Sequence, residues 1–322
     1  MSPGYWMTSG VRRLRGRLAR VVLLLPGVFL VSGCGGPSGP RVVVYAAQDR
    51  VFAEPVFRDF QRVTGIEVLA VYDNEATKTT GLANRLLAEK GRPQADLWWS
   101  NEEMRTRQLV RLGVLESGGA RFGERRRVLV CASNRLARVP VPATLSALTQ
   151  PAFRGRVAMA FPLFGTTATH LLVLRQRWGE PAWRVWCQAL RDNRPLLVDG
   201  NSVVVRLVAS GDAWIGVTDT DDVAAAQREG LPVVAIPLGS AESMAIPNTV
   251  AEVRGARHPE AARRLADFLA TTDVSRRLAR DGAFDLPGEG RIVPEEPEMR
   301  EWDSLIDGLD SALGWLGEVF GR

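Results

Sequence analysis

Short apolar runs alternate with amphipathic stretches along most of the chain after residue 40. Runs such as 41–45 (RVVVY) and 95–99 (ADLWW) are typical of buried strands, whereas 54–64 repeats apolar residues at helical spacing and ends at Gly65. The predicted strands cover 41–45, 66–71, 95–99, 127–131, 155–160, 213–217 and 233–236, and the predicted helices cover 54–64, 79–89, 102–112, 144–148, 167–178, 181–190, 201–209, 221–228, 259–279 and 299–320. Strands that alternate with helices indicate an α/β fold with parallel sheets.

The length and composition fit two such units in series. The chain has 322 residues, which suggests about two domains at roughly 150 residues per domain. Hydrophobic residues make up 46% and charged residues 24% of the chain, so wholesale disorder is excluded. In such folds, ligands bind beyond the carboxyl ends of the strands or at domain junctions, and polar residues there are the candidates for function.

The positive net charge belongs to an N-terminal leader. Five arginines and no acid fall within the first 33 residues, and the remaining 36 basic residues balance the 36 acidic ones. The basic composition therefore does not indicate nucleic-acid binding, and no such partner is expected. An apolar stretch follows at 21–30; it is about half as long as a bilayer-spanning helix and is interrupted by Pro26, so it predicts an export signal.

Small residues lead from this apolar stretch into Cys34. The order resembles a bacterial lipobox, which predicts a signal peptide over 1–33, a lipid on Cys34 and a flexible tether over 34–40. The protein is then exported and held by its lipid in the periplasm or cell envelope; the alternative is a plain secretory signal. The two further cysteines, Cys131 and Cys187, suit either a disulfide or two buried thiols.

Polar residues follow several of the predicted strands. The candidates at these positions are Asp49, Asn101, Glu102, Gly165, Thr166, Thr167, Asn201, Ser202, Asp219, Asp221 and Asp222. The carboxylates suit a hard cation, which prefers oxygen ligands, and the threonine-rich helix starts suit an anion. If the loops face one cleft, they form one binding site.

Each of these residues also has a purely structural interpretation. Acids in the first turn of a helix complement its dipole, which accounts equally well for Asp222 and in part for Asp221. The 165–167 segment suits a turn and helix start, Asn101 suits a helix cap, and Asp49 suits a solvated loop. No catalytic motif for a hydrolase or nucleotide-binding enzyme is present, and with two histidines in the chain we expect no enzymatic activity.

Several segments of the chain carry a resemblance to a known family. They are 63–66 (VTGI), 95–100 (ADLWWS), 151–156 (PAFRGR), 201–204 (NSVV), 246–249 (IPNT) and 258–264 (HPEAARR). The chain resembles the periplasmic solute-binding proteins of ABC importers, and within them the ferric-iron-binding branch. The resemblance implies a two-lobe, type 2 periplasmic-binding fold with a hinge and a ligand cleft between the lobes. It assigns 41–126 with 241–322 to the first lobe and 127–240 to the second.

The resemblance also implies a ligand set. Family members typically bind iron through a histidine, a glutamate and two adjacent tyrosines, with an anion completing the coordination. The histidine position falls on Asp49, the glutamate position on Asn101 with Glu102 next to it, and the tyrosine positions on Asp221 and Asp222. The anion positions fall on Gly165, Thr166 and Asn201. This chain therefore departs from the family by replacing both phenolates with carboxylates.

These observations together predict a substrate-binding lipoprotein of an ABC importer. It would bind Fe(III) or another hard cation with a synergistic anion, use no catalytic cofactor, act as a monomer and dock a permease in the membrane. The alternatives are a binding protein for a small organic cation such as an amine, and a sensor or accessory lipoprotein that does not transport.

Overall fold

The computed structural model describes residues 39–72, 78–117, 119–138, 141–286 and 299–321. Residues 39–322 form one unit. The predicted signal peptide, Cys34 and most of the tether lie outside the described residues. Among the described helices, none is both long and apolar enough to cross a bilayer.

The first lobe is built on three parallel strands. Strand β1 (Arg41–Ala46) lies between β2 (Glu67–Val71) and β3 (Leu97–Ser100). The helices of this lobe are α1 (Arg50–Thr64), α2 (Lys78–Ala88), α3 (Glu103–Arg111), α8 (Pro259–Leu269) and α9 (Thr272–Arg280). Apolar side chains from β1, α1, α8 and α9 form one buried cluster. The alternation of short apolar strands with amphipathic helices thus produces the predicted layered unit.

The second lobe repeats this plan. Strand β5 (Val157–Ala160) pairs in parallel with β6 (Leu196–Val198) on one side and with β7 (Ile215–Asp219) on the other. The remaining elements of this lobe are β8 (Val233–Pro237), the short 3-10 helices Ser133–Arg135, Leu145–Thr149 and Pro151–Phe153, and the helices α4 (Gly165–Trp178), α5 (Glu180–Asp192), α6 (Asn201–Ser210) and α7 (Thr220–Arg228).

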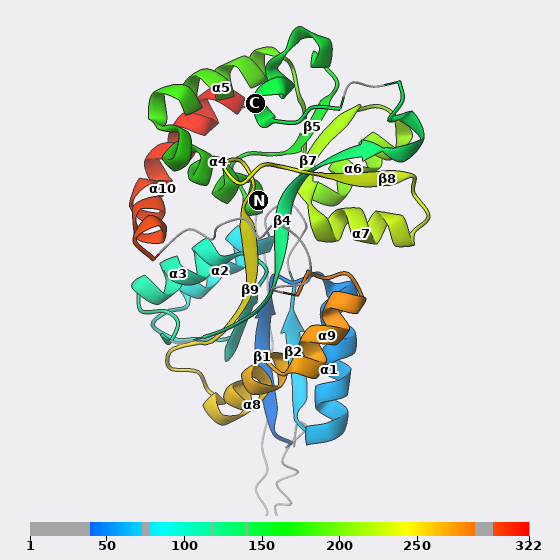
Figure 1. Ribbon diagram of the computed structural model, residues 1–322. Coiled ribbons are helices and arrows are strands. Elements are labelled where there is room, and N and C mark those ends of the chain that lie inside the picture. The colour runs from blue at the N-terminus through cyan, green and yellow to red at the C-terminus, as the bar shows by residue number, and fades with distance from the viewer. Residues whose placement is uncertain (1–38, 73–77, 118, 139–140, 287–298, 322) are drawn as a thin grey trace, which may run out of the picture. The chain divides into compact units, whose positions relative to one another are not determined.

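Two long antiparallel strands connect the lobes. The first half of β4 (Ala120–Ala132) pairs with β9 (Ala245–Glu252), and the second half pairs with β7 and β8. On its other edge, β9 pairs with β3 of the first lobe. Figure 1 shows β4 and β9 running side by side from one lobe into the other. These two crossing strands place residues 125–127 between the lobes.

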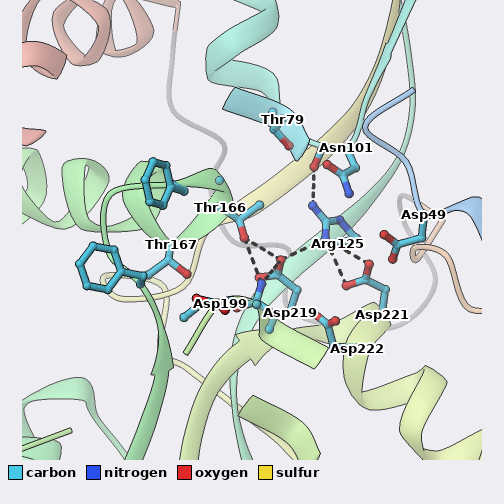
Figure 2. A pocket seen from close by; sticks show the side chains of 16 residues that line it. Asp49, Thr79, Asn101, Arg125, Thr166, Thr167, Asp199, Asp219, Asp221 and Asp222 are labelled. Carbon is cyan, nitrogen blue, oxygen red and sulfur yellow. Dashed lines mark hydrogen bonds and ion pairs between the residues drawn. The ribbon is translucent and has the colours of Figure 1, made fainter. Parts of the chain in front are cut away.

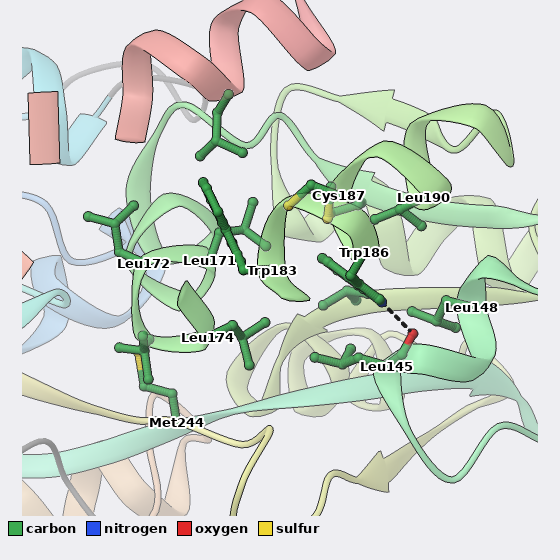
Figure 3. Close-up of a cluster of buried hydrophobic side chains, with 14 of the residues drawn as sticks. Leu145, Leu148, Leu171, Leu172, Leu174, Trp183, Trp186, Cys187, Leu190 and Met244 are labelled. Carbon is green, nitrogen blue, oxygen red and sulfur yellow. Dashed lines mark hydrogen bonds between the residues drawn. The ribbon is translucent and has the colours of Figure 1, made fainter. Parts of the chain in front are cut away.

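The large core of the second lobe is rich in tryptophan and leucine. Trp183 and Trp186 of α5 pack with Leu171 and Leu174 of α4, and the Trp186 indole nitrogen donates to the Leu145 carbonyl at 3.0 Å (Figure 3). The C-terminal helix α10 (Met299–Phe320) adds its apolar face to this core. It contacts α4 and α5 and also α3 of the first lobe. The predicted residue boundaries of the two lobes stay a prediction.

The structure corrects the sequence prediction in three places. The single helix predicted over 259–279 is wrong: two helices form, because the Thr271 side chain caps a new helix start by accepting from the Val274 amide. The helix predicted over 144–148 is a 3-10 helix over Leu145–Thr149. Strands β6 and β9 and the first half of β4 were not predicted, since Pro247 and Asn248 interrupt the apolar run of β9 and charged residues fill 124–127.

Candidate ligand-binding site

A small polar cavity of about 60 Å³ lies among the loops that follow the strands (Figure 2). The residues that line it are Asp49, Thr79, Asn101, Arg125, Ala160, Phe161, Phe164, Gly165, Thr166, Thr167, Asp199, Gly200, Asn201, Asp219, Asp221 and Asp222. They come from both lobes and from the crossing strand β4. Nine of the eleven residues predicted from the sequence are among them.

The topology explains why residues so far apart in sequence meet here. Strands β5, β6 and β7 are parallel, so their carboxyl ends lie at the same edge of the sheet, and α4, α6 and α7 begin there. Asp49 and Asn101 follow the parallel strands β1 and β3 in the first lobe in the same way. The cavity therefore follows the general rule for α/β sheets.

The Asp219 carboxylate accepts hydrogen bonds from four side chains. Asp219 ends β7, is fully buried and accepts hydrogen bonds from Arg127 Nη1 at 2.6 Å and Arg125 Nη1 at 3.0 Å. Thr166 Oγ1 donates to it at 2.8 Å and Asn201 Nδ2 at 3.0 Å. Burial alone would raise the pKa of this carboxyl, but the adjacent Arg127 and Arg125 guanidiniums hold it below its usual value. Asp219 is thus an anion at neutral pH.

Arg125 connects the two lobes. Its Nη1 atom lies 3.1 Å from Asp221 Oδ2 in addition to its contact with Asp219, and its Nη2 atom donates to the backbone carbonyl of Asn101. The side chain is only 4% exposed. The guanidinium therefore lies between acceptors from α7 of the second lobe and from the loop after β3 of the first.

Asp222 lies among several negatively charged side chains. One carboxylate oxygen from each of Asp219, Asp221 and Asp222 lies within 4.8 Å of the other two. Burial, followed by the charges of Asp221, Asp219 and Asp49, raises the pKa of Asp222 well above its usual value, and Arg125 offsets this in part. Thr218 Oγ1 donates to Asp222 at 3.3 Å. The position therefore favours either a proton or another cation.

The two predicted residues that do not line the cavity have other surroundings. Glu102 is the N-cap of α3: it accepts from the amides of Met104 and Arg105, and Thr169 Oγ1 donates to it at 2.8 Å. Ser202 lines a neighbouring hollow together with Asp49, Asp221 and Asp222. A ligand-binding role for either residue stays a prediction.

The predicted anion-binding residues surround a carboxylate of the protein itself. Thr166 and Asn201 both donate to Asp219, while Gly165 begins α4 with a φ of 54°. Thr167 lines the cavity beside them. An anion-binding role for these residues stays a prediction. In this structure the donors of Thr166 and Asn201 serve the Asp219 carboxylate.

The remaining candidates for reactive chemistry are buried. Among the described residues, Cys131 and Cys187 are free thiols and both are buried. His170 is 1% exposed, and its Nε2 atom lies 2.6 Å from the Glu242 carbonyl oxygen. Burial, and next the Arg127 charge, lowers the pKa of His170 to about 3, so the ring is neutral at neutral pH.

Sequence reasoning missed the arginines of the site. In the sequence, the run 125–127 suggests a charged boundary before an apolar strand. In the structure these residues belong to β4, and residues two apart in a strand face the same side, so the side chains of Arg125 and Arg127 lie on the same face. Arg127 lies opposite Asp219 in the register of β4 and β7. The aromatic lining, Phe161 and Phe164, follows β5 and was also not predicted.

Comparisons with known proteins agree with this architecture. A curated relative, an uncharacterized protein of Haemophilus influenzae, is 27% identical over 236 residues, which is 65% of this chain and 67% of the relative. The solved structure of the periplasmic binding protein AfuA from Actinobacillus pleuropneumoniae, with fructose-6-phosphate bound, has a TM-score of 0.75 at 17% identity and covers 87% of this chain and 98% of its own.

A second solved structure has the same fold. Iron-bound HitA from Pseudomonas aeruginosa has a TM-score of 0.73 at 17% identity, with 87% of this chain and 99% of that chain covered. The TM-scores of the two structures show that this chain has the two-lobe periplasmic-binding fold with its hinge and cleft. Residues 41–283 match the model of the bacterial extracellular solute-binding proteins. The chain belongs to this family of bacterial extracellular solute-binding proteins, the substrate-binding components of ABC transporters.

Proposed function

We propose that this protein captures a small hard cation, Fe(III) or another multivalent metal ion together with an anion, in the cleft for an ABC importer. The observation that carries the proposal is the charge of the cavity. Five aspartates line it, against the single arginine Arg125 in the lining and Arg127 bonded to Asp219. Oxygen-rich, negatively charged sites suit hard cations.

Asp49 and Asp222 are the best candidates for direct contact with the ion. They belong to different lobes, since Asp49 follows β1 and Asp222 lies in the first turn of α7, and both line the cavity. Burial and then the charges of the neighbouring aspartates raise the pKa of Asp222, and a cation between Asp49 and Asp222 would offset those charges. Binding to residues of both lobes stabilises the arrangement in which the lobes lie together, which is how such a ligand shifts the hinge equilibrium.

A small organic cation is the second candidate. Phe161 and Phe164 line the same cavity, with ring centroids 6.2 Å apart. Aromatic faces attract ammonium groups, and the neighbouring carboxylates accept their N–H donors. An amine would use this mixed aromatic and acidic lining, whereas a bare metal ion would use the carboxylates alone.

The proposal includes the setting in which the protein works. A lipid on Cys34 would hold an exported monomer at the membrane beside the permease that receives its ligand. The same structure would also serve a lipoprotein that senses the ligand without transporting it. Transport of the ligand by the neighbouring permease, measured in cells with and without this protein, distinguishes the two.

Thermal-shift titration tests the ligand class. We expect one hard cation from a panel of Fe(III)-citrate, Tb(III), Mn(II) and Ca(II) to stabilise the protein, by about 2.7 kcal/mol at a hundredfold excess over its Kd. Asp222→Asn should remove the shift, and the exposed matched control Asp192→Asn should keep it. A set of small amines is titrated in the same way. A shift with amines alone favours the second candidate, and no shift with any cation contradicts the proposal.

A further inference from the structure

Arg125 makes the contacts that a bound cation would make. Its Nη1 atom bonds Asp221 and Asp219 of the second lobe, at 3.1 and 3.0 Å, and its Nη2 atom bonds the carbonyl of Asn101 of the first lobe. Asp221 and Asn101 are two of the residues predicted from sequence to bind the ligand. The guanidinium lies among them in Figure 2.

The side chain reaches this position because of where its strand runs. Strand β4 crosses between the lobes, and residues 125 and 127 share one face while Arg126 takes the other. Arg126 bonds Glu124 and lines a separate hollow between α7 and the segment after α9. Arg125 is thus a cation on the crossing strand β4 that lines the ligand cavity.

Resting on the proposed function, we infer that the Arg125 guanidinium is a tethered cation, a positive charge that belongs to the protein and occupies the ligand site. It competes with the transported cation for the carboxylates of the cleft and thereby sets the charge selectivity of the site. The guanidinium carries a single fixed positive charge beside Asp221 and Asp219. It repels an incoming metal ion in proportion to that ion's charge, and the repulsion is strong in a buried site. A multivalent ion must either displace Arg125 from Asp221 or bind beside it.

The same contacts also give Arg125 a role in the ligand-free protein. By bonding α7 and the Asn101 carbonyl at once, it holds the ligand-free lobes together through charge-assisted hydrogen bonds. Removing the charge should therefore have two effects. The ligand-free lobes should separate more, and multivalent cations should bind more tightly.

The test compares the full-length chain with Arg125→Gln, Arg125→Lys and the matched control Arg126→Gln. Tb(III) affinity is measured by isothermal titration, and the radius of gyration of the ligand-free protein by small-angle X-ray scattering. We expect Arg125→Gln to bind Tb(III) at least tenfold more tightly and to be more extended without ligand. Arg126→Gln should resemble the wild type in both measurements, since Arg126 lies outside the cavity. Arg125→Lys should resemble the wild type in Tb(III) affinity, since Lys keeps the charge. Its single ammonium does not bond Asp221 and the Asn101 carbonyl as the two Nη atoms of Arg125 do, so this variant should be more extended without ligand.

Each outcome decides the inference. A folded Arg125→Gln protein with unchanged or weaker Tb(III) binding and an unchanged radius of gyration overturns it and leaves Arg125 as a structural ion pair. Tighter Tb(III) binding in Arg126→Gln as well overturns the specific role of residue 125. If none of the proteins binds Tb(III) but Arg125→Gln is extended, the proposed function is wrong and the role of Arg125 in cation selectivity is overturned with it, which leaves only its bond between the ligand-free lobes.

Discussion

Replacing Asp219 by Asn should destabilise the protein strongly. The carboxylate is fully buried and is the shared acceptor of Arg127, Arg125, Thr166 and Asn201. Asn keeps the shape but removes the charge between two buried guanidiniums. Breaking a buried ion pair in this way costs about 3–5 kcal/mol, a large part of the 5–15 kcal/mol that stabilises a typical protein.

Chemical denaturation of Asp219→Asn measures this cost. The exposed control Asp192→Asn should change the free energy of unfolding by less than about 0.5 kcal/mol. Arg127→Met tests the pair: the double variant Asp219→Asn/Arg127→Met should lose less than the sum of the two single losses, because each single change leaves a partner uncompensated. A loss below about 1 kcal/mol in Asp219→Asn would refute the reasoning that this network stabilises the ligand-free protein.

Three further predictions concern the rest of the molecule. Because the pKa of His170 is held at about 3, well below its ordinary value, its contribution to the free energy of unfolding is fully present above about pH 6.5 and decreases by about 1.4 kcal/mol per pH unit as the pH falls toward 3. His170→Gln should lack this pH-dependent loss when the free energy of unfolding is measured at pH 6.5 and 4.5. Trp302→Ala should cost about 3–5 kcal/mol in urea denaturation, because the indole is 1% exposed in the core that α10 shares with α4 and α5; a loss near zero would mean that α10 is not packed there. Gly123→Ala should destabilise by more than about 1 kcal/mol in the same assay, because φ is +65° and the new Cβ would lie 2.1 Å from the Phe284 ring, and wild-type stability would contradict this.

The elements that the sequence predicts well are those with strong local signals. Strand β1 is a continuous apolar run, and α1 has its apolar residues on one face and Gly65 at its end with a φ of 71°. Strand β9 lacks such a signal, since its pairing with both β3 and β4 is a tertiary property. Its Pro247 and Asn248 would not suggest a central strand, and tertiary pairing overrides that local preference.

Most of the polar residues that line the candidate site could be predicted from the sequence, but the ion pairs among them could not. The rule that polar residues after parallel strands converge was enough to bring Asp49, Asn201 and Asp222 to one cavity. The arginines were missed because buried charges are rare, and their position depends on partners almost a hundred residues away, as with Arg125 and Asp221. The sequence alone therefore indicated carboxylates without a cationic partner, whereas in the structure these carboxylates belong to an ion-pair network that includes Arg125.

A crystal structure grown with Tb(III) tests the central claim most directly, because anomalous scattering locates the ion without assumptions about its ligands. The account predicts a single strong anomalous peak in the cavity, within coordination distance of the Asp49 and Asp222 carboxylates. A cavity without a peak, or ions found only at surface carboxylates such as Asp192, would contradict the claim that the cleft binds a hard cation.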